Sequence, residues 1–231
     1  MRKINIENTL RRSVHPYITD IELKTLINST PNGMYSKVKR LTAEGKLLHI
    51  RRGLYSLTEE LGYYTKPHMF ELAQHVYGPS YISLESALSF HGLIPEAVYS
   101  ITSVCTKRST EFKTPIGVFS YKHLPAEGFY TEVGLVSQDQ YKFLIASPWR
   151  AICDYAFCYK RYWASLKSLL EDMRINYEDL PELRDKELFA LNEYYKNKRL
   201  NKFLTQIKED FDSYKNKSTT EIAVNLTRSQ A

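Results

Sequence analysis

The chain has 231 residues, 43% hydrophobic and 25% charged, so it can bury a sizeable core in one large or two modest domains. Lysine and arginine number 32 against 26 acidic residues, which gives a net charge of +6 with histidine neutral. No apolar run approaches the roughly 20 residues that span a bilayer, and the polar start lacks a signal peptide's apolar centre. We therefore expect a cytoplasmic protein without membrane contact, whose three cysteines, at spacings unlike a zinc site, are reduced thiols.

The first strong pattern begins with a short helix. Apolar residues recur at helical spacing over 21–28, and Asp20 stands before them in the position of an N-cap. The residues expected to form the buried stripe of this helix are Ile21, Leu23, Leu26 and Ile27. Residues 29–33 are dense in turn formers, and Pro31 lacks the amide hydrogen that would continue the helix.

A second helix and a hairpin follow this turn. The helix is expected over 34–44, and its inner face carries three apolar residues, Met34, Val38 and Leu41. Two β-prone runs, 47–50 and 54–57, are joined by a turn in which Gly53 can take a positive φ. Two helices across a turn, followed by a hairpin, are the order of elements in a winged helix-turn-helix, which places its second helix in the major groove of DNA.

The outer face of the second helix and the hairpin are polar and basic. Side chains near the start of such a helix reach base edges, and the candidates for sequence readout are Asn32, Tyr35, Ser36 and Lys39. The side chains expected to meet phosphates are Lys37, Arg40, His49, Arg51 and Arg52. Taken alone, this pattern equally fits a solvated amphipathic helix followed by a basic hairpin. The combination of turn, helix and hairpin favours DNA binding.

The positive charge is concentrated at the N-terminal end. Residues 1–57 hold eleven basic and four acidic side chains, a net of +7, so the remainder of the chain sums to −1. A polyanion would therefore be attracted to this end. Basic charge would also suit RNA or an anionic membrane, but RNA-binding modules normally show aromatic stacking motifs that this sequence lacks. We predict a DNA-binding domain over 1–62 and a second domain over 63–231.

The second domain mixes helices and strands. Helices are expected over 67–76 and 84–91, the latter between an N-cap at Ser83 and Gly92 just past its end. The β-prone runs that suit an antiparallel sheet are 99–106, 116–124, 132–136 and 141–145.

The C-terminal part of this domain is predicted to be helical. Ser147-Pro148 is typical of a helix start, with the helix over 149–159. The helical pattern runs from 162 to about 215, breaks around 176–181, and ends in residues without a clear pattern. The predicted fold class is α+β: an N-terminal winged helix-turn-helix, then a mixed α/β domain with an antiparallel sheet and a helical C-terminus.

Three segments carry a resemblance to a known family. They are IRRGLYSL at 50–57, YISLESALSFHGL at 81–93 with the strands SITSVCT and IGVFSYKHL that follow it, and LIASPWRAICDYAF at 144–157. With them the chain resembles the AbiEi family of abortive-infection antitoxins, the regulator partners of bacterial nucleotidyltransferase toxins. The resemblance covers most of residues 15–160. Its second segment is the most specific, since many regulators share a winged helix.

The resemblance implies an antitoxin of two domains. The first would repress its own operon by binding inverted repeats in promoter DNA, and the second would oppose the cognate nucleotidyltransferase toxin, with or without direct contact. The positions that match the family's recognition helix and wing are Ser36, Lys37, Lys39, Arg40 and Arg52, and those in its signature helix are Ser83, Ser86 and His91. Members commonly have an acid directly after the Ser-Pro pair, where Trp149-Arg150 stands here.

Other functions find less support in the sequence. Residues that could be imagined around a catalytic site are Glu85, His91, His123, Asp154 and Glu171, but no metalloprotease motif, phosphate-binding glycine loop or nucleophile elbow is present. His91 fits a histidine that bonds the free carbonyls of a helix end, and Asp154 fits a buried acceptor. The alternatives are a ligand-responsive winged-helix regulator and, with less support, a DNA-processing enzyme. We predict an autorepressor and antitoxin without catalytic activity, cofactor or metal.

Overall fold

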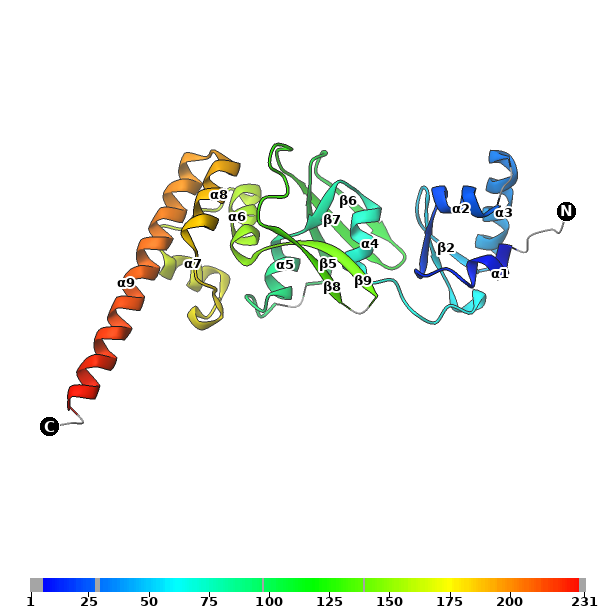
Figure 1. Ribbon diagram of the computed structural model, residues 1–231. Helices are drawn as coiled ribbons and strands as arrows, with labels where there is room; N and C mark the ends of the chain where they lie inside the picture. The colour runs from blue at the N-terminus through cyan, green and yellow to red at the C-terminus, as the bar shows by residue number, and fades with distance from the viewer. Residues whose placement is uncertain (1–5, 28–29, 97, 139, 229–231) are drawn as a thin grey trace.

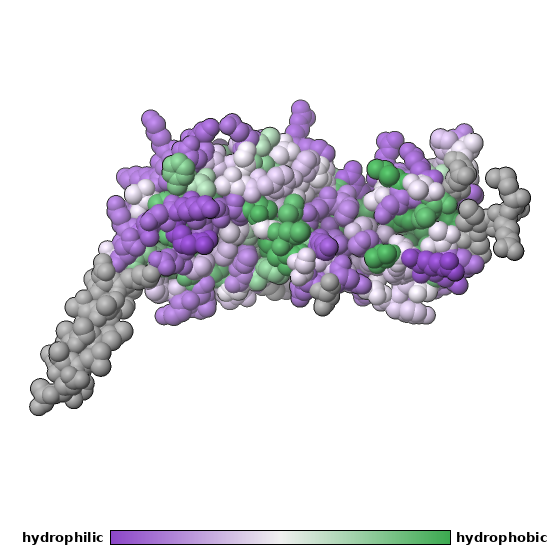
Figure 2. All heavy atoms as spheres, in the orientation of Figure 1, coloured by the Kyte–Doolittle hydropathy of each residue, from purple (hydrophilic) through white to green (hydrophobic). Residues whose placement is uncertain are grey.

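A computed structural model gives the structure of residues 6–27, 30–96, 98–138 and 140–228, with side chains described up to Ser213 except at Ile27. The fold is α+β, and its elements follow one another along an elongated body, with an N-terminal unit (residues 6–61) at one end, a sheet in the middle and helices at the other end (Figure 1). Figure 2 shows hydrophobic patches over the N-terminal unit and over the central sheet, set among hydrophilic side chains.

The N-terminal unit packs three helices on a small antiparallel sheet. Its elements are α1 Ile6–Leu10, β1 Tyr17–Thr19, α2 Asp20–Ile27, α3 Pro31–Ala43, β2 Leu47–Arg51, β3 Leu54–Leu57 and the 3-10 turn η1 Glu59–Leu61. The strand order is β1-β3-β2. Leucines from every helix meet in its core, among them Leu10, Leu23, Leu41 and Leu61, each wholly buried. The sequence did not predict α1 or β1.

The start of α2 differs from the prediction. Thr19, not Asp20, caps this helix: its amide and hydroxyl donate to Glu22 Oε2 at 2.7 and 2.8 Å, and the Glu22 amide donates to Thr19 Oγ1 at 3.3 Å. This reciprocal pair is a capping box. It turns Ile21 outward, 76% exposed, so Leu23 and not Ile21 provides the buried contact. Of the other predicted stripe residues, Leu26 packs at the edge of this core and the side chain of Ile27 lies outside the described residues.

Helix α3 begins earlier than predicted. Thr30 accepts a hydrogen bond from the Gly33 amide at 3.3 Å, and Pro31 occupies the first turn, where a missing amide hydrogen costs nothing. Asn32 and Gly33 are therefore helical and not part of the turn. The predicted inner face is confirmed, because Met34, Val38 and Leu41 are all buried.

The hairpin lies where the sequence placed it. Gly53 has φ +82° at its turn, and a Cβ there would lie 3.1 Å from Asp20 Oδ2. The Asp20 amide donates to the Gly53 carbonyl at 2.9 Å. Glycine is thus required both for the backbone conformation and for the close approach of α2.

The central sheet is mixed, so the predicted antiparallel sheet is wrong. Its elements are α4 Met69–Val76, β4 Ser80–Ile82, α5 Leu84–Phe90, β5 Ser100–Cys105, β6 Thr110–Thr114, β7 Gly117–His123, β8 Val133–Gln138 and β9 Tyr141–Ala146. The order is β6-β7-β5-β4-β9-β8, in which β5 pairs with β7 and β4 with β9 in parallel. Two strands that the sequence did not predict account for this: β4, a wholly buried strand of three residues that pairs in parallel with β9, and β6, which lies between β5 and β7 in the chain and forms the antiparallel neighbour of β7.

Helices complete the C-terminal end. They are α6 Pro148–Tyr159, α7 Leu166–Met173, α8 Asp185–Tyr195 and α9 Lys198–Arg228, with the 3-10 turn η2 Tyr177–Asp179. Ser147 accepts from the Arg150 amide at 3.2 Å, which confirms the predicted start of α6. Helix α9 packs on α6, α7 and α8 and then extends away from them (Figure 1). It continues past residue 215, where a tail was expected, because residues 198–228 contain neither glycine nor proline.

The N-terminal unit also shares a core with the rest of the chain. Tyr17, Ile50 and Leu54 belong to the large buried cluster that includes Leu72 and Tyr121 of the second unit (residues 69–228). The hydroxyl of Tyr17 lies 3.1 Å from Nε2 of His75, a residue of α4. The predicted boundary at residue 62 is therefore crossed by apolar and polar contacts.

Burial lowers the pKa of two histidines, His68 and His75, and the contribution of His68 to the pH dependence of stability can be tested separately. The ring of His68 stacks on those of Tyr141 and Phe143, at centroid distances of 4.9 and 5.1 Å. Burial lowers the pKa of His68 below its ordinary value of 6.5, although the charge of Glu71 partly offsets this. The folded state then binds fewer protons than the unfolded state at mildly acidic pH, so stability present above about pH 6.5 is lost as the pH falls.

We expect the free energy of unfolding to decrease between pH 7.5 and pH 5.5, and the decrease to be smaller in His68→Phe. Urea titrations at each pH measure both. His123→Gln, at an exposed histidine of β7, is the matched control and should keep the pH dependence of the original chain. An equal decrease in His68→Phe would show that His68 does not contribute.

Candidate nucleic-acid interface

The outer face of α3 exposes all four predicted base-reading residues and one residue predicted to meet phosphates, Arg40. The exposed side chains are Asn32, Tyr35, Ser36, Lys39 and Arg40, and Tyr35 is 68% exposed despite its aromatic ring. Lys37 lies on the flank and is half-buried. Because the opposite face holds the helix on its core, this outer face is a rigid surface on which polar groups keep fixed spacings.

Local contacts determine which donors, acceptors and charges of each side chain remain available to a ligand. The Ser36 hydroxyl donates to the Asn32 carbonyl at 3.0 Å, so it can only accept a further hydrogen bond. Arg40 Nε lies 3.5 Å from Glu44 Oε1 in an exposed pair, which is worth little but reduces the local positive charge. Lys39 forms no ion pair with any described residue. Lys39 is therefore the cation of this face most available to a ligand.

The hairpin separates its basic residues into two groups. Arg52 and His49 are exposed, and the His49 ring lies 5.4 Å from the Tyr55 ring. Arg51 does not join them: its guanidinium lies over the ring of Phe112 in β6, 5.1 Å from the centroid. The prediction of a phosphate contact for Arg51 is therefore corrected to a junction contact. A shift of register between His49 and Arg51 marks a bulge, which alters the alternation of side chains along β2.

Sequence reasoning missed one exposed apolar residue of the N-terminal unit. Ile21, in the first turn of α2, was assigned to the core and is 76% exposed. Exposed apolar side chains near a groove can contact the methyl group of thymine. The Thr19-x-x-Glu22 spacing of the capping box was the signal that could have placed Ile21 outside.

The family-signature residues of the second unit are structural contacts and not an exposed site. Ser83 occupies the N-cap position of α5 as predicted, but its hydroxyl forms no cap bond and donates instead to Asp154 Oδ2 at 2.6 Å. Ser86 and Thr102 bond each other twice, at 2.9 and 2.8 Å. His91 Nε2 lies 2.8 Å from the carbonyl of Ala146 at the end of β9, not from its own helix end. These bonds tie α5 to β5, β9 and α6.

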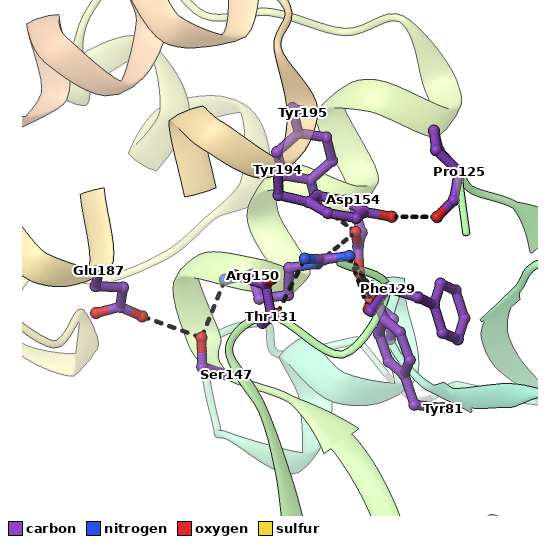
Figure 3. A network of polar contacts seen from close by, with 11 residues as sticks. Tyr81, Pro125, Phe129, Thr131, Ser147, Arg150, Asp154, Glu187, Tyr194 and Tyr195 are labelled. Atoms are coloured by element: carbon purple, nitrogen blue, oxygen red, sulfur yellow. Dashed lines mark hydrogen bonds and ion pairs between the residues drawn. The ribbon is translucent and has the colours of Figure 1, made fainter. Parts of the chain in front are cut away.

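A buried ion pair stands at the centre of these contacts (Figure 3). Arg150 and Asp154 are wholly buried, and Arg150 Nε donates to Asp154 Oδ1 at 3.0 Å. The Tyr81 hydroxyl donates to Asp154 Oδ2 at 3.0 Å, and the Tyr195 hydroxyl donates to Asp154 Oδ1. The Arg150 guanidinium lies 3.8 Å from the ring centroid of Tyr194. The prediction of a buried acceptor at Asp154 is confirmed.

The ion pair between Arg150 and Asp154 makes further hydrogen bonds and shifts the pKa of neighbouring tyrosines. Arg150 also donates to the carbonyls of Thr131 and Phe129, at 2.9 and 3.3 Å, and to the Tyr81 hydroxyl at 2.7 Å, so four of its five N–H groups have acceptors. Burial, and then the charge of Asp154, raise the pKa of both Tyr81 and Tyr195. Two opposite charges with satisfied hydrogen bonds can be buried where either alone could not.

Three further findings concern ligands and relatives. In the described part of the chain, no group of three or more His, Cys, Asp or Glu residues is close enough to hold a metal ion, and the cysteines at 105, 153 and 158 are free thiols. No helix in the same ranges is both long and apolar enough to cross a bilayer. Neither the comparison with protein-family models nor that with curated proteins gives a match.

Proposed function

We propose that the N-terminal unit is a winged helix-turn-helix and that the protein is a DNA-binding transcriptional regulator. The observation that carries this proposal is the exposed polar face of α3, on a helix whose other face is buried, together with the exposed Arg52 at the turn of the β2–β3 hairpin. The order helix, strand, two helices and hairpin supports it, as does the net charge of +7 over residues 1–57. In this proposal α3 is the recognition helix and the β2–β3 hairpin is the wing.

Within that class, we propose an antitoxin that represses its own operon and opposes a nucleotidyltransferase toxin, with no catalytic step of its own. The resemblance of three segments to the AbiEi family supports this. A structural contact joins two of those segments: Ser83 of the second bonds Asp154 of the third. The second and third matching segments, 81–93 and 144–157, are therefore in direct contact in the folded chain.

The salt dependence of DNA binding tests the first step. Affinity for a random-sequence duplex should fall steeply with salt, because neutralised phosphates release counterions. Arg52→Ala should lower the slope of log affinity against log salt by about 1. Arg40→Ala should lower it less, because Glu44 already lies 3.5 Å from Arg40 Nε. Fluorescence anisotropy at several salt concentrations measures the slopes.

Lys186→Ala is the matched control, since Lys186 is an exposed lysine on α8 at the other end of the molecule. Its slope should equal that of the original chain. Absence of duplex binding at low salt, or an Arg52→Ala slope equal to the control, would contradict the proposed interface.

Co-expression tests the second step. The full chain should restore growth to bacteria that express the neighbouring toxin gene from an independent promoter. The double variant Lys39→Ala/Arg52→Ala should still restore growth while releasing repression of a reporter under the chain's own promoter. A fragment without the N-terminal unit is a poor reagent, because it would expose the core surface that Tyr17, Ile50 and Leu54 cover. Failure of the full chain to restore growth at matched expression would end the antitoxin proposal.

A further inference from the structure

An open cavity of about 650 Å³ lies where the two parallel strands β5 and β7 end. Its lining includes the loop 106–109, which follows β5, and His123, the last residue of β7. This size lies in the range of small-molecule sites. Where a sheet contains parallel strands, ligands commonly bind outside the carboxyl ends of those strands. The position of the cavity in the fold therefore favours a binding site.

The charged side chains of this cavity are all basic. Lys107 and Arg108 are exposed, and neither forms an ion pair with any residue in the described ranges. The Lys107 ammonium lies 5.2 Å from the ring centroid of Tyr77, a contact that attracts the cation without neutralising it. Within the described part of the chain, no acidic side chain lines the cavity. The cavity is therefore electropositive and suits an anion.

The loop 106–109 is held in place by contacts that use its acceptors and not its donors. The carbonyl of Lys107 accepts a hydrogen bond from His123 Nδ1 at 3.0 Å, and the carbonyl of Arg108 accepts one from the Tyr77 hydroxyl at 3.4 Å. Ser109 Oγ accepts from the His123 amide at 2.9 Å, which leaves the hydroxyl hydrogen available. A hydroxyl and two cations can thus donate to one phosphate.

A second open cavity, of about 540 Å³, shares Thr106 with the first and is lined mainly by apolar groups. Its aromatic rings are those of Phe129 and Tyr130, whose centroids lie 5.0 Å apart. Tyr130 is 50% exposed, so part of its ring is open to stacking by a planar group. No charged side chain from the described residues lines this cavity. It therefore suits an aromatic body attached to the anion.

We propose that the two cavities together bind a free nucleoside phosphate, with its phosphate at the loop 106–109 and its base on Tyr130. Charge-assisted hydrogen bonds hold the phosphate, and stacking holds the base. A duplex fits less well, because its bases are paired and stacked inside the helix and do not reach an aromatic ring. This proposal is independent of the DNA interface proposed on α3 and the hairpin, and of antitoxin activity.

Calorimetry on the full chain in magnesium-free buffer tests the proposal with AMP as the probe. Adenosine lacks the phosphate, and ribose phosphate lacks the base. We expect saturable binding of AMP and at least about tenfold weaker binding of each of the other two, since each loses one of the two contacts. Equal binding of AMP and adenosine, equal binding of AMP and ribose phosphate, or no saturable binding of AMP up to about 10 mM would overturn the proposal.

Two variants separate the halves of the site. Arg108→Ala should weaken AMP binding at least about tenfold, and an unchanged affinity would contradict the phosphate position. It should melt like the original chain, because the contact that Arg108 gives to Tyr77 comes from its carbonyl. Tyr130→Leu should weaken binding of AMP but not of ribose phosphate, and equal AMP affinity would contradict stacking. Lys113→Ala, at an exposed lysine of β6 that lines neither cavity, is the control and should bind AMP like the original chain.

A competition experiment distinguishes a free nucleotide from the phosphates of DNA. It uses the double variant Lys39→Ala/Arg52→Ala, in which the proposed DNA interface is weakened. A random-sequence duplex should not displace AMP from this variant. Displacement would assign the loop 106–109 to duplex phosphates and overturn the proposal, whether or not the N-terminal unit binds DNA.

Discussion

Replacing Asp154 by alanine is expected to lower the free energy of unfolding by about 3–5 kcal/mol. The change leaves the wholly buried guanidinium of Arg150 without its counter-charge, and it removes the acceptor shared by Tyr81, Ser83 and Tyr195. Urea unfolding followed by circular dichroism measures the loss. It should be among the largest for any single substitution outside the apolar core.

Two further variants separate charge burial from packing. Arg150→Met/Asp154→Leu removes both charges and should recover much of the stability lost in Asp154→Ala, because no unpaired ion remains buried. Glu171→Ala breaks an exposed pair with Lys167 and should cost less than about 1 kcal/mol. A loss below about 1 kcal/mol for Asp154→Ala would mean that the buried pair is not structurally important.

The second large effect is expected at Lys39. Lys39→Ala should weaken binding to a duplex selected from a random pool by about 1–3 kcal/mol, roughly 5- to 150-fold. The reason is that Lys39 is exposed on the outer face of α3 and is free of ion pairs with the described residues, so its donors can reach base edges. Binding to unselected duplex should fall much less, and competition titrations with both duplexes measure the difference.

Ser36→Ala is the matched comparison on the same face. Its effect should be smaller than that of Lys39→Ala, because the Ser36 hydroxyl hydrogen is already donated to the Asn32 carbonyl. An equal loss on selected and unselected duplex for Lys39→Ala would assign Lys39 to phosphate contact instead of base readout.

Local patterns were enough to predict several elements. The apolar spacing of Met34, Val38 and Leu41 gave the buried face of α3, and Gly53 gave the hairpin turn. The Ser-Pro pair before α6 gave the start of that helix. In each case, the residues that determine the structure are neighbours in the chain, so their effect is visible in the sequence.

The error at Ile21 came from an overlooked local signal, the Thr19–Glu22 capping box, but the larger errors arose where residues distant in the chain determine the structure. The mixed sheet depends on the parallel pairs β4–β9 and β5–β7, whose members are separated in the chain by other strands. Arg51 and Arg52 are the same type of residue, so the sequence does not distinguish them. In the fold, Arg51 contacts the ring of Phe112 in the second unit. The pairing of Arg150 with Asp154 follows helical spacing, yet nothing local shows that tyrosines from β4 and α8 close around it. The base-reading residues stay predictions.

The burial of the residues that flank the hairpin turn has a mechanical consequence. Ile50 and Leu54 are buried in the hydrophobic core of the second unit, and the Tyr17 hydroxyl is hydrogen-bonded to His75 of α4. If the N-terminal unit binds DNA as proposed, these contacts keep it from rotating freely against the second unit. If two copies bind neighbouring half-sites of an operator, the size of their second units sets the distance between those half-sites. Adding or deleting a few base pairs between the half-sites should then abolish simultaneous binding of the two copies.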